Sequence, residues 1–122
     1  MTEPTLMVHY YLAENPLEIS PRDLRRRLDA GEGVRVVDVR EAWEFQLCRI
    51  EGAELIPMGD IPAALSRLDG DEAPLVVYCH HGVRSLRVAN WLRQQGIEQV
   101  HSLQGGIDRW SLEIDPKVPR YA

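Results

Sequence analysis

Short apolar runs rich in β-branched residues recur along the chain, and most are followed by a segment whose apolar residues have helical spacing. A run of about four to eight such residues bounded by turn signals is typical of a strand that is buried on both faces. The pattern predicts strands over residues 17–19, 34–39, 54–56, 75–78 and 99–103. The run Leu-Val-Val-Tyr at residues 75–78 gives the strongest of these signals.

The segments between the strands carry the start and stop signals of helices. Ser20 is placed to cap a helix that has Pro21 at its first position, and Gly31 is placed to end it. Further helices are predicted from apolar residues on one face: over residues 59–68 (Ile61, Leu65, Leu68), after residue 82 (Leu86, Ala89, Leu92, closed by Gly96), and after Gly105 and Gly106 (Ile107, Trp110). The alternation predicts an α/β fold with a mostly parallel sheet and helices on both faces.

The length of the chain matches one ordinary domain. Its 122 residues suffice to bury a core without a disulfide or a structural metal, and 44% hydrophobic and 27% charged residues are typical of a globular protein. We predict one domain over residues 17–122, preceded by an arm over residues 1–16. Tyr10, Tyr11 and Leu12 of the arm are candidates for packing on the domain.

Charge and hydropathy limit the partners of the chain. No apolar run approaches the roughly 20 residues that cross a bilayer, and the N-terminus lacks a basic-then-apolar signal pattern. We therefore expect a cytoplasmic protein without a membrane partner. The net charge of -5 disfavours nucleic acid, whose phosphates demand a basic face, but leaves small anions open as substrates.

The strongest chemical signal is a short loop between a predicted strand and a predicted helix, with the sequence Cys79-His80-His81-Gly82-Val83-Arg84. Ligands of open parallel sheets bind beyond the carboxyl ends of the strands. Successive N–H groups of a short loop, aided by the positive end of a helix dipole, form a cradle for an anion. Because such a setting stabilises a thiolate, Cys79 is the predicted nucleophile.

The other loop residues are candidates for binding an anionic substrate. Gly82 lets the backbone turn, Val83 contributes backbone, and Arg84 with His80 and His81 adds positive charge. Adjacent histidines chelate one zinc poorly, and the sequence has no second Cys/His cluster, so we expect neither a metal nor a cofactor.

Structural alternatives stay open for the same residues. Cys79 could be a buried packing residue, the two histidines solvated loop residues, and Arg84 an exposed helix charge. Asp38 and Arg40 end a neighbouring predicted strand. They either brace the loop through an ion pair or form a structural pair elsewhere.

The chain resembles the rhodanese family in the order and spacing of several motifs. These are Asp38-Val39-Arg40-Glu41, Glu44-Phe45, Ile50-Glu51-Gly52-Ala53, Ile56-Pro57, the loop from Cys79 to Arg84, and Gly105-Gly106-Ile107 followed by Trp110. The resemblance implies a five-stranded parallel sheet, a persulfide on Cys79 and no metal. It also implies a sulfurtransferase that moves sulfane sulfur from a small anionic donor such as thiosulfate to cyanide, a thiol or a sulfur-carrier protein.

The length of the loop bears on two rival functions. Families of this fold that act on phosphate or arsenate carry one more loop residue, whereas Arg84 here is five positions after Cys79. This resembles the sulfur-handling class. A cysteine-dependent phosphatase or arsenate reductase, and a regulatory module without turnover, remain as alternatives.

One motif departs from the common pattern. Many rhodaneses have Gly-His before the Ile-x-Gly-Ala stretch, where this chain has Cys48-Arg49. This pair and the tail from Trp110 to Tyr121 resemble rhodanese domains attached to adenylyltransferases, which load sulfur onto small carrier proteins with a Gly-Gly end. A carrier of this kind is therefore an expected partner. We expect Cys48 to be a buried packing residue, with a resolving thiol as the alternative.

Overall fold

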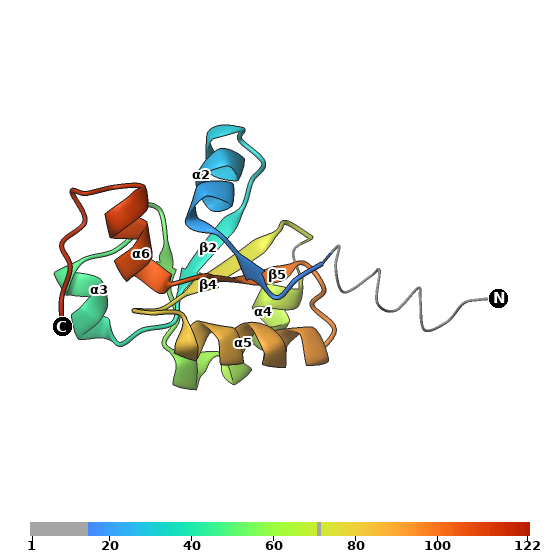
Figure 1. Cartoon of the computed structure of the whole chain (residues 1–122). Coiled ribbons are helices and arrows are strands. Elements are labelled where there is room, and N and C mark those ends of the chain that lie inside the picture. The colour runs from blue at the N-terminus through green and yellow to red at the C-terminus, as the bar shows by residue number, and fades with distance from the viewer. Residues whose placement is uncertain (1–14, 71) are drawn as a thin grey trace.

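A computed structural model describes residues 15–70 and 72–122 and contains one five-stranded sheet (Figure 1). The strands are β1 (Glu18–Ile19), β2 (Arg35–Asp38), β3 (Glu54–Leu55), β4 (Leu75–Tyr78) and β5 (Val100–Leu103). Their order is β1-β5-β4-β2-β3, and every neighbouring pair is parallel. The predicted α/β fold is confirmed, with the strand that precedes Cys79 at the centre of the sheet.

Helices cover both faces of the sheet. They are α2 (Pro21–Asp29), α3 (Ala42–Leu47), α4 (Leu65–Asp69), α5 (Val83–Gln94) and α6 (Gly106–Glu113). In Figure 1, α4 and α5 lie on one face, and α2 and α6 lie on the other. α3 lies beside the C-terminus at the end of the sheet nearest α6.

The predicted helix over residues 59–68 is interrupted. The segment forms two 3₁₀ turns, η1 (Met58–Asp60) and η2 (Pro62–Ala64), before the short helix α4 begins. Pro62 explains the break, because proline has no N–H to donate and its ring clashes with the preceding turn of a helix. Ile61 and Leu68 are buried as their spacing predicted, and Leu65 is half-buried.

The predicted ends of two other helices are confirmed. The side-chain oxygen of Ser20 accepts a hydrogen bond from the Asp23 N–H at 3.1 Å, which caps α2. At the end of α5, the N–H of Gly96 donates to the Arg93 carbonyl and that of Ile97 to the Leu92 carbonyl. The buried face of α5 includes Ser85, Val88, Ala89 and Leu92, whereas Leu86 is half-buried.

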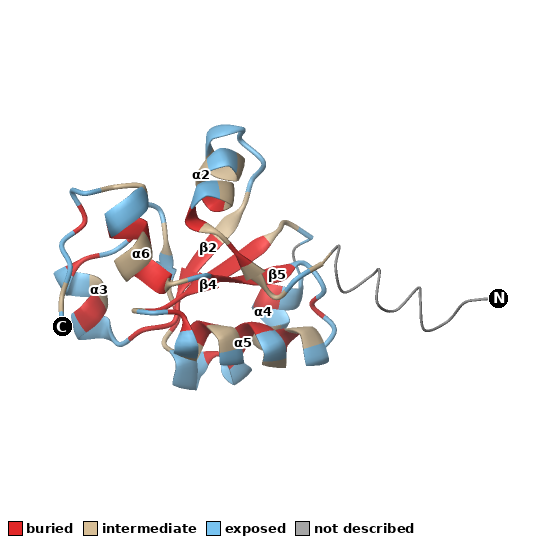
Figure 2. Ribbon diagram, viewed as in Figure 1, coloured by how far each residue is buried: buried red, intermediate tan, exposed pale blue. Residues whose placement is uncertain are grey.

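Alternate residues of the strands divide the core into two layers. Figure 2 shows the central strands coloured as buried. Leu75 and Val77 of β4 pack on one side of the sheet with Leu92 of α5. Val76 and Tyr78 pack on the other side, in the cluster that contains Trp110 and Leu24. The strands are therefore buried on both faces, as their continuous apolar sequences predicted.

The expected N-terminal arm lies almost entirely outside the described residues. Tyr10, Tyr11 and Leu12 belong to this undescribed part, so their predicted packing stays a prediction. The carbonyl groups of Asn15 and Pro16 accept hydrogen bonds from the Arg93 guanidinium. Among the described residues, no helix has the length and apolar character needed to cross a membrane.

The amino end of α6 holds the loop that follows β4. The N–H of Ile107 donates to the Cys79 carbonyl at 2.9 Å, and the N–H of Asp108 donates to the His80 carbonyl at 3.1 Å. This approach requires glycine at position 106, where φ is +64°. A Cβ atom at Gly106 would lie 2.5 Å from the Cys79 carbonyl oxygen and closer still to that of His80.

We predict that Gly106→Ala lowers the free energy of unfolding by at least about 3 kcal/mol, since a backbone collision adds to the cost of a left-handed alanine. Gly33→Ala is the matched control, because Gly33 has a φ of +73° but open space around its Cβ position. Its expected cost is about 1–2 kcal/mol. Urea unfolding of both variants measures the difference, and equal costs would contradict the close approach.

Candidate active site

Cys79 lies at the carboxyl end of β4 with 1% of its surface exposed. Its sulfur accepts hydrogen bonds from two backbone N–H groups, that of Gly82 at 3.1 Å and that of Ser85 at 3.3 Å. Gly82 has a φ of +100°, which turns the chain around the sulfur and into α5. The loop therefore forms a cradle around the sulfur, at the carboxyl end of β4.

The hydroxyl groups of Ser85 and Ser102 lie next to each other beneath the Cys79 sulfur, and that of Ser85 contacts it. The Ser85 oxygen lies 3.4 Å from the Cys79 sulfur and 2.8 Å from the hydroxyl of Ser102 on β5. Both serines are fully buried. A hydroxyl can rotate between accepting and donating, so Ser85 can accept from a thiol or donate to a thiolate. Ser102 can donate to Ser85 in the second case.

Arg84 points its guanidinium at Glu44 on α3. The two side chains form a bidentate pair, with N–O distances of 2.8 and 3.0 Å. The bonds to Glu44 raise the pKa of Arg84. Burial alone would raise the pKa of Glu44, but the donors Arg84 and Tyr121 outweigh it and lower that pKa to about 2. Arg84 is thus a permanent cation held in a fixed direction beside the loop.

Asp38 and Arg40 form a fully buried ion pair. The Arg40 guanidinium also donates to the Cys48 carbonyl at 2.5 Å and to the Tyr121 hydroxyl at 2.9 Å. Burial would lower the pKa of Arg40, but the bonds to Asp38 and Tyr121 raise it instead. The sequence left open whether this pair braces the Cys79 loop or forms a structural pair elsewhere. In the structure the pair contacts the loop only indirectly: Arg40 binds Tyr121, and Tyr121 stacks on His80.

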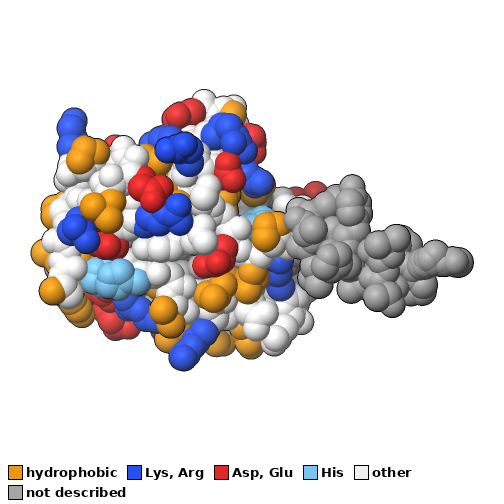
Figure 3. Space-filling model, viewed as in Figure 1, with side chains coloured by type: hydrophobic (Ala, Val, Ile, Leu, Met, Phe, Trp, Pro, Cys, Tyr) orange, Lys and Arg blue, Asp and Glu red, His pale blue; other side chains and the backbone are white. Residues whose placement is uncertain are grey.

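His80 and His81 form the rim of the loop together with Tyr121. The ring centroids of His80 and Tyr121 are 3.8 Å apart and nearly parallel, and the His80 and His81 centroids are also 3.8 Å apart. Burial and the neighbouring His81 lower the pKa of His80. Figure 3 shows a histidine patch near the C-terminal end of the fold, bordered by acidic, basic and hydrophobic side chains. Val83 is 64% exposed at the start of α5.

One group of side chains could offer ligands to a metal ion. His80, His81 and Asp108 each have a ligand atom within 4.8 Å of the others. The Asp108 carboxylate, however, accepts two hydrogen bonds from Arg120, at 2.8 and 3.2 Å. The His80 and His81 rings are stacked on each other, and His81 Nε2 lies 4.0 Å from the Asp108 carboxylate.

Sequence reasoning gave no role to four residues that the structure brings to the site: Glu44, Ser85, Ser102 and Tyr121. A local sequence signal for Glu44 existed, because its spacing of three positions after Glu41 is that of a capping box at the start of a helix. The structure contains this box, in which the Glu44 carboxylate accepts from the Glu41 N–H at 3.0 Å. Ser85 and Ser102 come together from different elements, 17 positions apart. No local pattern could have paired them.

A family model described as "Rhodanese-like domain" matches residues 20–113. The chain belongs to the rhodanese family. YtwF of Bacillus subtilis, described as a putative sulfurtransferase, is 38% identical over 100 residues, which make up 82% of this chain and 95% of that protein. The structure of the human single-domain sulfurtransferase TSTD1 superposes with a TM-score of 0.69 at 27% identity, covering 80% of this chain and 96% of that one.

A longer relative shares the same region. MoeZ of Mycobacterium tuberculosis, described as a probable adenylyltransferase/sulfurtransferase, is 36% identical over 105 residues. The match covers 84% of this rhodanese chain but only 26% of MoeZ. This bears out the resemblance to adenylyltransferase-linked rhodanese domains that the Cys48-Arg49 pair and the tail suggested.

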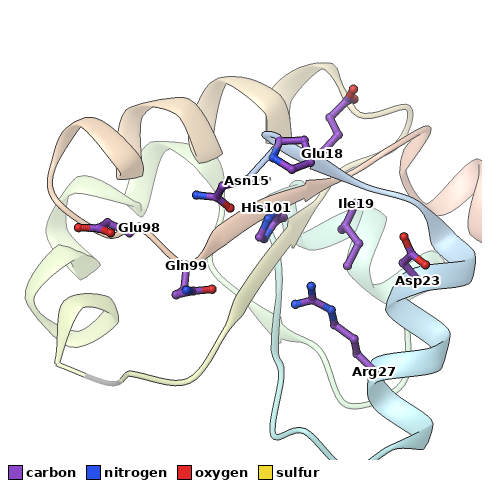
Figure 4. Close-up of a pocket in the computed structure, with 9 residues that line it drawn as sticks. Asn15, Glu18, Ile19, Asp23, Arg27, Glu98, Gln99 and His101 are labelled. Carbon is purple, nitrogen blue, oxygen red and sulfur yellow. The ribbon is translucent and has the colours of Figure 1, made fainter. Parts of the chain in front are cut away.

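A hollow of about 350 Å³ lies at the amino ends of β1 and β5, away from Cys79 (Figure 4). It is lined by residues that include Arg27, Gln99 and His101. His101 is 7% exposed, and its Nδ1 atom has no hydrogen-bond partner among the described residues. Burial, with a smaller contribution from Arg93 and Arg27, lowers the pKa of His101 to about 4.

This histidine predicts a pH-dependent stability. Above pH about 6.5 His101 is neutral in both states, whereas between about 6.5 and 4 only the unfolded chain takes up the proton. Stability therefore falls as the pH falls through this window, by up to about 2–3 kcal/mol from this group. His101→Gln should show a shallower loss between pH 6.5 and 4.5, a range above the titration of Glu44.

The matched control is Asn90→Gln, which changes an exposed side chain on α5 and removes no titratable group. Its unfolding free energy should follow the parent across the same range. A slope in His101→Gln equal to that of the parent would show that His101 is not held neutral.

Proposed function

We propose that this rhodanese is a sulfurtransferase in which the Cys79 thiolate accepts sulfane sulfur and carries it as a persulfide. The observation that supports this most directly is the pair of N–H groups, from Gly82 and Ser85, that point at the Cys79 sulfur. Fixed N–H donors stabilise an anion without reorganising when it forms. The descriptions of YtwF as a putative sulfurtransferase and of TSTD1 as a single-domain sulfurtransferase support the same class of reaction.

The first half-reaction loads the enzyme. With thiosulfate as donor, the Cys79 thiolate attacks the outer sulfur, a new S–S bond forms, and the bond to the sulfonate sulfur breaks with its electron pair. Sulfite leaves, and Cys79 carries a persulfide anion. The total charge is conserved, and no proton is taken up or released.

The second half-reaction unloads it. Cyanide attacks the outer persulfide sulfur, thiocyanate leaves, and the Cys79 thiolate returns. A small thiolate reacts in the same way and becomes a persulfide. Because Cys79 is 1% exposed, the outer sulfur, about 2 Å further out, is the atom that an acceptor reaches.

Residues His80, His81, Gly82, Val83 and Arg84 are proposed to bind the anionic donor. A guanidinium has five N–H donors, and the bonds to Glu44 use two of those of Arg84. Donors therefore remain for a sulfonate group while the direction of the guanidinium stays fixed. His80 is half-buried and His81 is exposed, and both directly follow Cys79 in the loop.

We predict that the protein, incubated with thiosulfate and weighed intact, gains the mass of one sulfur atom, and that Cys79→Ser gains none because a hydroxyl cannot hold a persulfide. Cys48→Ser is the matched control: Cys48 is also buried, and this variant should still load and still transfer sulfur to cyanide. Loading of Cys79→Ser, or turnover of an aryl phosphate without any sulfur gain, would contradict the proposal.

We further propose a small sulfur-carrier protein with a Gly-Gly end as acceptor, on the likeness to MoeZ. The outer persulfide sulfur would attack the adenylated carboxyl carbon of the carrier, and AMP would leave. The resulting acyl disulfide needs a thiol as reductant. One thiolate attacks the Cys79 sulfur and releases the carrier thiocarboxylate, and a second thiolate frees Cys79 as the two thiols become a disulfide.

To test the acceptor, the protein is loaded with labelled sulfur and offered, with dithiothreitol present, either glutathione or a purified carrier adenylated at its Gly-Gly end. We predict that the label appears mainly as carrier thiocarboxylate. A carrier that is not adenylated is the control and should stay unlabelled. Transfer to small thiols with no labelled carrier would remove the carrier from the proposal and leave the sulfurtransferase in place.

A further inference from the structure

The penultimate residue of the chain, Tyr121, lies over the rim of the Cys79 loop. Its ring stacks on His80 with a centroid distance of 3.8 Å and an interplanar angle of 7°. The ring of Trp43 on α3 meets Tyr121 edge-on at 6.1 Å. Tyr121 is therefore held between α3 and the residue that directly follows the nucleophile.

The hydroxyl of Tyr121 joins two ion pairs. It donates to the Glu44 carboxylate at 2.5 Å and accepts from the Arg40 guanidinium at 2.9 Å. Glu44 in turn holds Arg84, the last residue of the loop, through both of its oxygens. One phenol thus touches both ends of the loop, His80 through its ring and Arg84 through Glu44.

The tail that carries Tyr121 is fixed to the domain. Val118 is 8% exposed and packs in the cluster that contains Trp110. The Ser111 hydroxyl donates to the Val118 carbonyl at 2.6 Å, and Arg120 pairs with Asp108. Because these contacts anchor the residues before it, Tyr121 has a defined position rather than a loose contact.

We infer that Tyr121 is a positioning residue for the Cys79 loop: its ring fixes the plane of His80, and its hydroxyl holds Glu44 where Glu44 directs the Arg84 guanidinium. The inference deepens the proposed function and rests on it for the effect on a sulfur donor. Burial and the neighbouring His81 keep the pKa of His80 below its usual value, and a hydrogen bond with the Tyr121 backbone acts in the opposite direction.

Two substitutions separate the two contacts. Tyr121→Phe keeps the stacked ring but leaves Glu44 and Arg40 each without one hydrogen bond, whereas Tyr121→Ala removes both contacts. Lys117→Ala is the matched control, because Lys117 is an exposed residue of the same tail. Thermal unfolding of each variant checks that the fold persists.

The first readout needs no sulfur transfer. Cys79 is alkylated at one pH with anionic iodoacetate and with neutral iodoacetamide, and the ratio of the two rates reports the positive charge at the mouth. We expect Tyr121→Phe to lower this ratio about three- to tenfold, less than the full value of one charge-assisted hydrogen bond, because Glu44 keeps both of its bonds to Arg84. Arg84→Gln removes the guanidinium charge and should give the lowest ratio of the two alkylation rates. Lys117→Ala should give the same ratio as the parent.

The second readout follows the imidazole of His80 by NMR. Tyr121→Ala should raise its titration midpoint toward the ordinary value of about 6.5, while Tyr121→Phe should leave it near that of the parent. If the parent transfers sulfur, the KM for thiosulfate should rise about three- to tenfold in Tyr121→Phe with kcat changed less than about twofold.

The outcomes distinguish the two proposals. A parent protein that never loads sulfur overturns the proposed function, but the alkylation ratio and the His80 titration still decide the role of Tyr121. A parental alkylation ratio in both Tyr121 variants would overturn that role. Equal shifts of the His80 midpoint in the two variants would also overturn it.

Discussion

The guanidinium of Arg40 has no exposed surface, so every part of its surroundings must compensate a full charge away from water. Asp38 supplies the counter-charge and accepts from Nε and Nη2 of Arg40. The Cys48 carbonyl also accepts from Nη2, and the Tyr121 hydroxyl accepts from Nη1. These partners come from β2, from the segment after α3 and from the C-terminal tail. Satisfying one buried cation therefore brings together the elements that surround the Cys79 loop.

Among the described residues, the charged side chains near Cys79 are almost all paired. Arg84 is paired with Glu44, Arg120 with Asp108, and Arg40 with Asp38. The stabilisation offered to a sulfur anion then comes chiefly from backbone N–H groups, with the directed guanidinium of Arg84 at the edge. This arrangement explains how a chain of net charge -5 can still present a favourable site to an anion.

The sequence predicted the parts of this fold that depend on local chemistry. The apolar run Leu75–Tyr78 and the capping residue Ser20 lie where their patterns placed them, because burial and hydrogen-bond demands are set within a few residues. The split of the helix at Pro62 is also readable from the sequence, because the backbone restriction of a proline outweighs the helical spacing of apolar residues. The position of Cys79 and Gly82 in a loop between β4 and α5 also followed from the predicted order of strand, loop and helix.

The rest of the site depends on contacts between distant parts of the chain. The partner of Arg84 is 40 positions away, and the contact between Arg40 and Tyr121 spans 81 positions. Neither pair has a periodic or local signature, since each forms only after the sheet has brought the carboxyl ends of its strands together. The sequence motifs therefore indicated the family of the chain, but they did not indicate which side chains contact each other.

The position of Tyr121 also has a practical consequence for handling the protein. In Figure 1 the C-terminus lies beside α3 and α6, at the end of the sheet that carries the Cys79 loop, whereas Asn15 and Pro16 border the hollow at the opposite, amino end of the strands. An affinity tag joined after Ala122 would begin one residue from the ring that stacks on His80. A purification or immobilisation handle attached on the Asn15 side would leave the reactive edge open.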